Sequence, residues 1–132
     1  MIDIFNQVYT SLVNALHGHD SKIETASVYT NMPSKYPFVS FEEIGNAVYE
    51  QTSDSCDIEN HADIEYEVNI YTQNPNKKSK GDGIAQVVDT SFKTLGFVRM
   101  TRNILQNQDD TTYRIILRYR GVVSKDHVIY RR

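Results

Sequence analysis

The chain has 132 residues, a formal net charge of −3, 39% hydrophobic and 23% charged residues, which are ordinary values for one globular domain and exclude a disordered chain. Its only cysteine, Cys56, excludes an intrachain disulfide, and no apolar run approaches the ~20 residues that span a bilayer. The first residues lack a basic leader, so we expect a protein made in the cytoplasm and without a membrane partner.

The first part of the chain predicts a helix and two strands. Apolar residues recur at steps of three and four from Ile2 to Leu16, which indicates an amphipathic helix that ends at Gly18. Residues 22–30 are rich in β-branched and aromatic side chains and predict a strand. After a turn with two prolines, residues 37–45 predict a second strand.

A polar and acidic segment at 46–62 follows the second predicted strand. It lacks periodicity, so we expect a protruding loop or an irregular hairpin arm, and loops of this length often carry function. Residues 63–72 then alternate apolar and polar side chains and predict the clearest strand of the chain. Residues 73–83 have the composition of a solvated loop.

The second part of the chain predicts a helix and three strands. Apolar spacing over 84–95 indicates an amphipathic helix that ends at Gly96. Strands are predicted at 97–105 and 113–120, with a turn at 106–110 between them, and a last short strand or tail lies within 124–132. The order α-β-β-β-α-β-β-β over residues 1–132 predicts one α+β domain, with two helices packed on one face of a mostly antiparallel sheet.

No set of residues indicates an enzyme, a cofactor or a metal site. His17, His19 and Asp20 lack a second cluster that would complete a metal site, so we interpret them as surface residues. Cys56 and His61 have acidic surroundings, which disfavour a reactive thiolate. The glutamate pairs of the second and third strands lack an accompanying lysine, and the glycines near residue 82 lack phosphate-binding spacing.

Positive and negative charges are divided along the chain. Residues 1–76 contain 12 acids and two lysines, for a net charge of −10, whereas residues 77–132 contain 12 bases and five acids, for +7. Two interpretations stay open: neighbouring strands neutralise each other within one sheet, or an acidic surface of one copy meets a basic surface of the next. A protein that grips only nucleic acid is more often basic overall.

The positive charges include an arginine stripe. On strand 113–120 three arginines project from one face: Arg114, Arg118 and Arg120. Arg102 would join them if its strand is adjacent. Glu65 and Glu67 on a neighbouring strand can neutralise the stripe, with about 0.2–1 kcal/mol per cross-strand pair. Otherwise the stripe forms a basic surface for another subunit or for phosphates, and protein partners are favoured because the strand's aromatic residues face the core.

The order of several motifs resembles a known family. These motifs are the YPFVSFEE strand at 36–43, the strand at 60–71, LGF at 95–97, RYR at 118–120 and the ending at 123–132. Together they resemble tail terminator (tail completion) proteins, minor structural proteins from the tail operons of phages and prophages of Gram-positive bacteria. The resemblance covers nearly the whole chain.

The resemblance implies a structural role in a virion and no enzymatic activity. Such proteins are small α+β domains that form a ring, typically of six copies, at the head-proximal end of the tail. The ring caps the tail tube, stops its polymerisation and joins the head–neck complex, and it contacts the sheath if the tail is contractile. The expected partners are therefore copies of the chain itself, the tube protein and the connector proteins, with DNA only as passing cargo in the lumen.

A ring closed by head-to-tail contacts needs two different complementary patches on each subunit. The acidic arm at 46–62, the arginine stripe and a C-terminal strand that adds to another sheet edge are the candidates. The candidate interface residues are Glu50, Asp54, Asp57, Glu59, Glu65, Glu67, Arg114, Arg118, Arg120, Tyr130, Arg131 and Arg132. The alternatives are a head–tail connector (adaptor or stopper) and a small nucleic-acid-binding protein, whose binding to bare duplex would depend strongly on salt.

Overall fold

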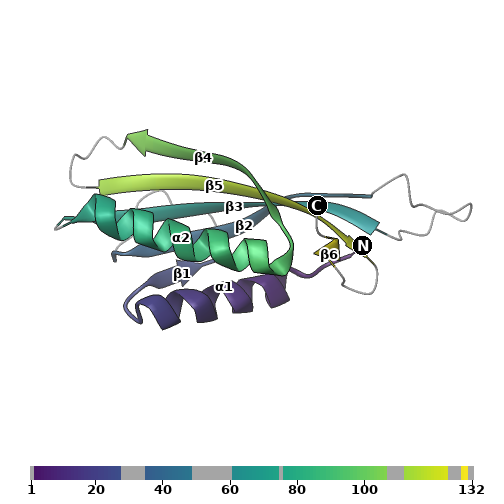
Figure 1. Ribbon diagram of the computed structural model, residues 1–132, viewed down its shortest axis with the longest axis horizontal. Helices are drawn as coiled ribbons and strands as arrows, with labels where there is room; N and C mark the ends of the chain where they lie inside the picture. Colours follow the sequence, from purple (N-terminus) through teal and green to yellow (C-terminus); the bar gives the residue numbers. More distant parts are fainter. Residues whose placement is uncertain are drawn as a thin grey trace, which may run out of the picture.

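The two predicted helices and six predicted strands are present in the predicted order (Figure 1). The computed structural model describes residues 2–27, 35–48, 61–74, 76–106, 112–124 and 129–130. The elements are α1 (Phe5–His19), β1 (Glu24–Ala26), β2 (Phe38–Val48), β3 (His61–Gln73), α2 (Lys77–Leu95), β4 (Val98–Gln106), β5 (Thr112–Ser124) and β6 (Ile129–Tyr130).

The strands form one mostly antiparallel sheet, as predicted. Its order is β1-β2-β3-β5-β4, with β3 and β5 in the centre, and only the short β1 pairs in parallel with its neighbour β2. The small strand β6 pairs with Val122 and Val123 of β5. It therefore continues the same edge of β5 that β4 occupies further along.

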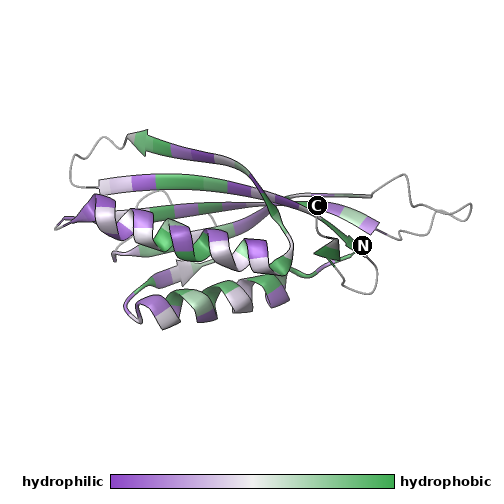
Figure 2. Ribbon diagram, in the orientation of Figure 1, coloured by the Kyte–Doolittle hydropathy of each residue, from purple (hydrophilic) through white to green (hydrophobic). Residues whose placement is uncertain are grey.

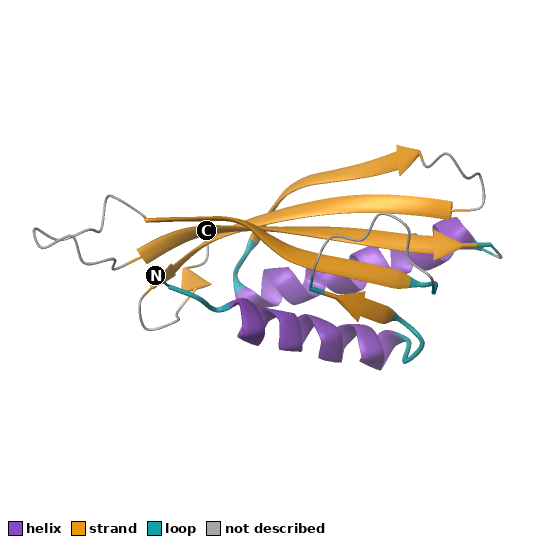
Figure 3. Cartoon of the chain, turned by 180° about the vertical axis from the view of Figure 1, so that it is seen from behind, coloured by secondary structure: helices purple, strands orange, loops and turns teal. Residues whose placement is uncertain are grey.

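Both helices lie on one face of this sheet, which confirms the predicted α+β architecture (Figures 1 and 3). The helices contribute the buried side chains of their apolar stripes, and β3 contributes fully buried residues from one face, among them Ile64, Tyr66, Val68 and Ile70. Figure 2 shows hydrophobic and hydrophilic bands alternating along the helices and the central strands. The core lies between the helices and the sheet because each element is apolar on one side only.

Aromatic rings occupy the middle of the core. Phe92 of α2 stacks on Tyr119 of β5 with ring centroids 4.1 Å apart and an interplanar angle of 10°. Phe97, just after α2, meets Phe92 edge-on at 5.6 Å, and Tyr66 of β3 lies 4.9 Å from Phe41 of β2. Such pairs add about 0.5–1.5 kcal/mol each beyond the burial of their area, so this cluster ties α2 to the central strands.

Three predicted helix boundaries are wrong, and the first is the start of α1, which begins at Phe5 and leaves Ile2 outside the helix. Helix α1 does not end at Gly18 but continues to His19, and its last turn closes when the Asp20 N–H donates to the Leu16 carbonyl. A glycine ends a helix only when the chain turns to positive φ there, whereas here Asp20 leaves the helix in an extended conformation. The predicted end of α2 at Gly96 is confirmed, with φ 105°.

The start of α2 also differs, because Lys77–Gly83 is helical where a loop was predicted. The Thr72 hydroxyl donates to the Lys77 carbonyl at 2.6 Å and holds the first turn against β3. Gly81 lies where a Cβ atom would come 2.6 Å from the ring of Tyr113. The glycine therefore permits a close helix–strand contact, which local composition does not reveal.

Strand lengths differ from the predictions at three places. In the described part of the predicted strand 22–30 only Glu24–Ala26 is strand, and β5 continues past residue 120 to Ser124. The third place is the acidic segment 46–62. Strands β2 and β3 pair as an antiparallel hairpin up to Val48↔Ala62, so both ends of this segment are regular strand. The arm between them, 49–60, lies outside the described residues, as do 28–34, 107–111, 125–128 and 131–132. The predicted short strand near the C-terminus is confirmed as β6.

Candidate assembly surface

The sheet face opposite the helices, here called the open face, carries the predicted arginine stripe. Its residues on the two central strands are Asp63, Glu65, Glu67 and Asn69 of β3, and Arg114, Ile116, Arg118 and Arg120 of β5. They share this face because alternate residues of a strand project to the same side, while Ile115, Leu117 and Tyr119 of β5 point into the core.

Arg118 and Glu67 form the predicted cross-strand pair. They are register partners on β5 and β3, and Arg118 Nη2 lies 3.3 Å from Glu67 Oε2. The amide of Asn69 also donates to Glu67 Oε1 at 3.2 Å. The Glu67 side chain is 14% exposed and the Arg118 side chain is 52% exposed, so the guanidinium keeps a free side for another partner.

Arg120 pairs with a residue that the sequence reasoning did not select. Its register partner is Glu65, but its guanidinium donates to Asp63, with Nε 2.7 Å from Oδ1 and 2.9 Å from Oδ2, and Nη2 also contacts Oδ2. Asp63 is the diagonal neighbour on the same face. The alternation of 63–72 places Asp63 on the face of Glu65 and Glu67, but the choice of partner depends on the twist between the strands.

Arg114 occupies a more sheltered place at the other end of the stripe. Its Nη2 donates to Asn69 Oδ1 at 3.0 Å, and its guanidinium carbon lies 5.2 Å from the ring centroid of Tyr71. Asn69 and Tyr71 are both buried. On this face β3 carries as many acids as β5 carries arginines: Asp63, Glu65 and Glu67. The central strands of the open face therefore have mixed charge and no excess of positive charge.

Arg102 does not join the stripe. It is the register partner of Leu117, which points into the core, so its side chain lies on the helix side and contacts Asp82 of α2 at 3.0 Å. Arg99 likewise contacts Asp89 of α2 at 3.3 Å. Asp82 and Asp89, seven residues apart on one face of α2, therefore connect the helix to β4. Sequence reasoning missed the first contact because it placed Asp82 in a loop, and the second because strand order is needed to bring Arg99 beside α2.

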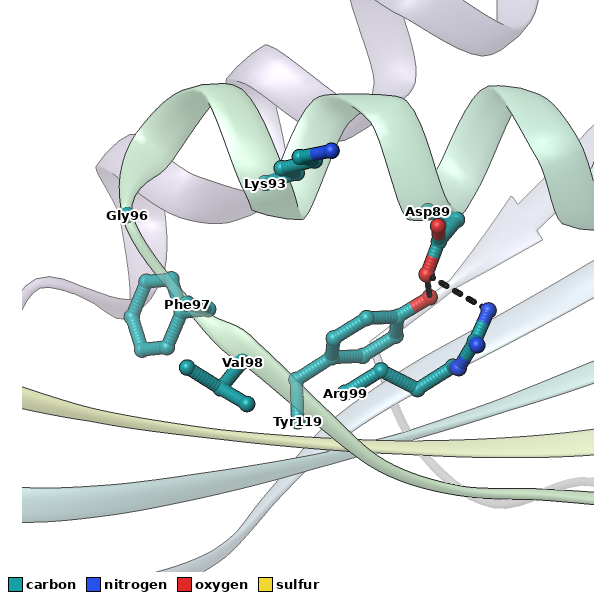
Figure 4. A pocket seen from close by; sticks show the side chains of 7 residues that line it. All are labelled: Asp89, Lys93, Gly96, Phe97, Val98, Arg99 and Tyr119. Atoms are coloured by element: carbon teal, nitrogen blue, oxygen red, sulfur yellow. Dashed lines mark hydrogen bonds and ion pairs between the residues drawn. The ribbon is translucent and has the colours of Figure 1, made fainter. Parts of the chain in front are cut away.

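A hollow of about 350 Å³ lies between the end of α2 and β4 (Figure 4). Its lining includes Asp89, Lys93, Phe97, Arg99 and Tyr119. The Tyr119 hydroxyl donates to Asp89 Oδ1 at 3.0 Å, and burial, followed by the charge of Asp89, raises the pKa of Tyr119. The phenol is therefore harder to ionise than that of an ordinary tyrosine, which is itself protonated at neutral pH.

A second polar cluster lies on the helix side of β2. Glu43 is the register partner of the buried Tyr66, and burial raises the pKa of Glu43, with a further contribution from the charge of Asp3. The amide of Asn46 donates to the Ile2 carbonyl at 2.8 Å and fixes the segment before α1 beside it. Among the described residues, no group of His, Cys, Asp and Glu is arranged to hold a metal ion.

Exposed apolar side chains gather on the outer strands of the sheet. Four of them belong to β4: Val98, Met100, Ile104 and Leu105. A fifth, Ile44, lies on β2. Sequence reasoning missed this feature because the segment 97–105 reads as an ordinary half-buried strand until the strand order shows that β4 is the edge.

The remaining predicted interface residues fall largely outside the described part of the chain. Glu50, Asp54, Asp57, Glu59, Arg131 and Arg132 lie outside it, and of Tyr130 only the backbone is described, paired with Val122. The predicted surface residues His17 and His19 are exposed at the end of α1. None of the described helices is long and apolar enough to cross a membrane.

Comparisons with known proteins give a likeness in fold. No protein-family model matches the chain, and neither does any curated protein. Among solved structures, the chain is similar to one from the virion of a native gene transfer agent (GTA) particle, with a TM-score of 0.53 and 16% identity. The match covers 89% of this chain and 91% of that one. The α+β fold described above is therefore shared, nearly end to end, with a protein of a virion.

Proposed function

We propose that this chain is a structural protein of a phage or phage-like particle, which forms a ring on the head-proximal end of the tail tube. The ring ends tube polymerisation and provides the joint to the neck. The observation that carries this proposal is the likeness in fold to a chain of a gene transfer agent virion, which leaves little of either chain unmatched.

The charges of the open face support a protein partner over a nucleic acid. Arg114 and Arg120 are engaged by β3, and Arg118 is already paired with Glu67. A duplex is held mainly by cations that neutralise its phosphates, and the three acids that share this face on β3 lower the positive charge that the face offers for that task. A surface of alternating charges is instead suited to a partner with its own alternating charges, where it selects the partner and its register.

The connector alternative is a ring protein of the same particle, and it predicts a different binding partner. Purified tail tube protein is polymerised with and without this chain, and tube length is measured by electron microscopy. We expect tubes to stop growing and to carry a ring of subunits at one end. Free tube growth together with binding to the portal or its adaptor would instead make the chain a connector.

A matched pair of variants links this activity to the open face. Arg118→Glu with Arg120→Glu reverses the stripe, and native mass spectrometry together with the tube assay reports ring formation and capping. Lys78→Glu with Lys80→Glu makes the same change in charge on α2, away from this face. We expect only the first variant to lose rings; rings that persist unchanged in both would count against the role of the open face.

A further inference from the structure

The two sides of the sheet end in strands with an unpaired edge. Strand β4 closes one side, and in the described part of the chain nothing pairs with its outer edge. On the other side β1 covers only Phe38–Ser40 of β2 (Figure 1). From Phe41 to Val48, β2 pairs with β3 on its inner edge, and no described residue pairs with its outer edge. The two free edges are of similar length.

The β4 edge is unusually apolar for a surface exposed to water. Every residue from Val98 to Leu105 is exposed, and Met100 and Ile104 are each about half exposed, at 52% and 51%. A long apolar edge strand is a template for pairing with another strand, and monomeric proteins avoid it with charges, prolines or very short edges. Strand β4 has no proline and two arginines, both turned toward aspartates of α2.

The free edge of β2 has matching properties. Its exposed apolar residue, Ile44, lies at an irregularity in the pairing with β3, between Glu43 and Gly45. Met100 lies at the equivalent irregularity of β4, between Arg99 and Thr101. Such bulges turn a side chain outward. Every exposed large apolar residue of the described chain is thus on one of these two edge strands.

The two edges carry opposite charges. Strand β4 has two arginines and no acid, and strand β2 has two glutamates and no base. Two β4 edges brought together by a two-fold axis would oppose like charges, and so would two β2 edges. Arg99 and Arg102 contact Asp89 and Asp82 of α2, but their side chains stay 47% and 38% exposed. A β4 edge against a β2 edge therefore brings these partly exposed arginines toward the strand that carries only acids, which favours the head-to-tail arrangement over a symmetric dimer.

We infer that the partner of the β4 edge is a second copy of this chain, which docks through the free β2 edge at residues 41–48. The contact extends the sheet from one copy into the next. The two edges are different and lie on opposite sides of the sheet, so each copy binds one neighbour through β4 and another through β2. The series closes into a ring if the rotation between copies permits it. This contact goes beyond the proposed function, since a ring could be held by other surfaces.

Lysine substitutions on the two edges test this contact. Ile104→Lys blocks the β4 edge and Ile44→Lys blocks the β2 edge, and both residues are exposed, so the fold is expected to be retained. Each variant alone should associate with a dissociation constant raised by roughly tenfold or more, measured by sedimentation velocity. A one-to-one mixture should form heterodimers and nothing larger, because one intact β4 edge and one intact β2 edge remain between the two variants.

Hydrogen exchange gives a second measurement that does not depend on the variants. In the assembled wild-type chain, amides of 41–48 and of 98–106 should gain protection relative to the monomeric variants. A symmetric β4 contact would leave Ile44→Lys fully assembled and the mixture without heterodimers, and this result would overturn the inference. A wild-type chain that stays monomeric at about 1 mM would also overturn the inference. At that concentration, even a weak contact with a dissociation constant of about 1 mM is half occupied.

The edge contact and the capping role can be tested separately. If the edge variants still cap tail tubes, the capping role stands and the edge contact is wrong. If the wild-type chain assembles through these edges but does not affect tube growth, the edge contact stands and the capping role is wrong.

Discussion

Arg118 and Glu67 lie directly opposite each other on β5 and β3, with a nitrogen and an oxygen of their side chains 3.3 Å apart. Thus a base from the basic second part of the chain meets an acid from the acidic first part inside one subunit. The division of charge along the sequence therefore corresponds, on this face, to the pairing of the two central strands.

Reversing this pair should cost little stability. Arg118→Glu places two carboxylates opposite each other, and because Arg118 is half exposed we expect the free energy of unfolding to fall by about 1 kcal/mol. The double variant with Glu67→Arg should regain most of this loss. Urea unfolding of the four chains gives the coupling energy, and a coupling near zero would show that the contact contributes nothing to the fold.

The two glycines of α2 should respond in opposite ways to alanine. At Gly81 a Cβ atom would come 2.6 Å from the Tyr113 ring, so we expect Gly81→Ala to destabilise by about 1–3 kcal/mol. At Gly83 the nearest atom is 3.7 Å away, on His19, so Gly83→Ala should stabilise the helix by about 0.5–1 kcal/mol. Thermal unfolding distinguishes them; equal shifts would mean that α2 does not pack on β5 as described.

Glu43 should make stability depend on pH. Its pKa is raised above 4.5 by burial and by Asp3, so between 4.5 and the folded pKa the native state holds a proton that the unfolded chain has lost. The free energy of unfolding therefore falls as pH rises through this window. We expect Glu43→Gln to be more stable than wild type at pH 7, with the difference shrinking toward pH 4.

Chemical unfolding at several pH values measures this effect. Glu42→Gln is the matched control, because Glu42 is the register partner of Glu67 and points to the open face. The account of Glu43 is contradicted if both variants follow the wild-type curve, or if Glu43→Gln loses stability at pH 7.

Phe92 should be among the most sensitive positions of the core. It is 1% exposed and contacts the rings of Phe41, Phe97 and Tyr119. We expect Phe92→Ala to lower the free energy of unfolding by about 3–5 kcal/mol, whereas Met100→Ala on the exposed edge should change it by less than about 0.5 kcal/mol. Equilibrium unfolding monitored by circular dichroism provides both values.

The periodicity of the sequence predicted which side chains share a face. The alternation in 63–72 and 113–120 correctly separated the core residues of β3 and β5 from the arginines and acids of the open face. This works because the side-chain period of a strand is two, whatever the strand pairs with. The same reasoning identified the helix stripes and the end of α2 at Gly96.

Properties that depend on a partner could not be predicted in this way. The pairing of Arg120 with Asp63 depends on register and twist, and the helical position of Gly81 depends on the ring of Tyr113 across the core. The position of β4 at the edge follows from strand order, which connects residues far apart in the chain. Each of these is decided by tertiary contacts that override local composition.

A protein that caps the tail tube must sit between the tube and the neck of the particle. Particles from cells that express the complete set of tail genes should be imaged by cryo-electron microscopy, with the chain carrying a density tag at its exposed Ser79 turn of α2. We predict a ring of tagged subunits between the tube and the neck, and tubes of irregular length when the chain is omitted. Tubes of normal length without the chain, or tag density at any other place on the particle, would contradict the account.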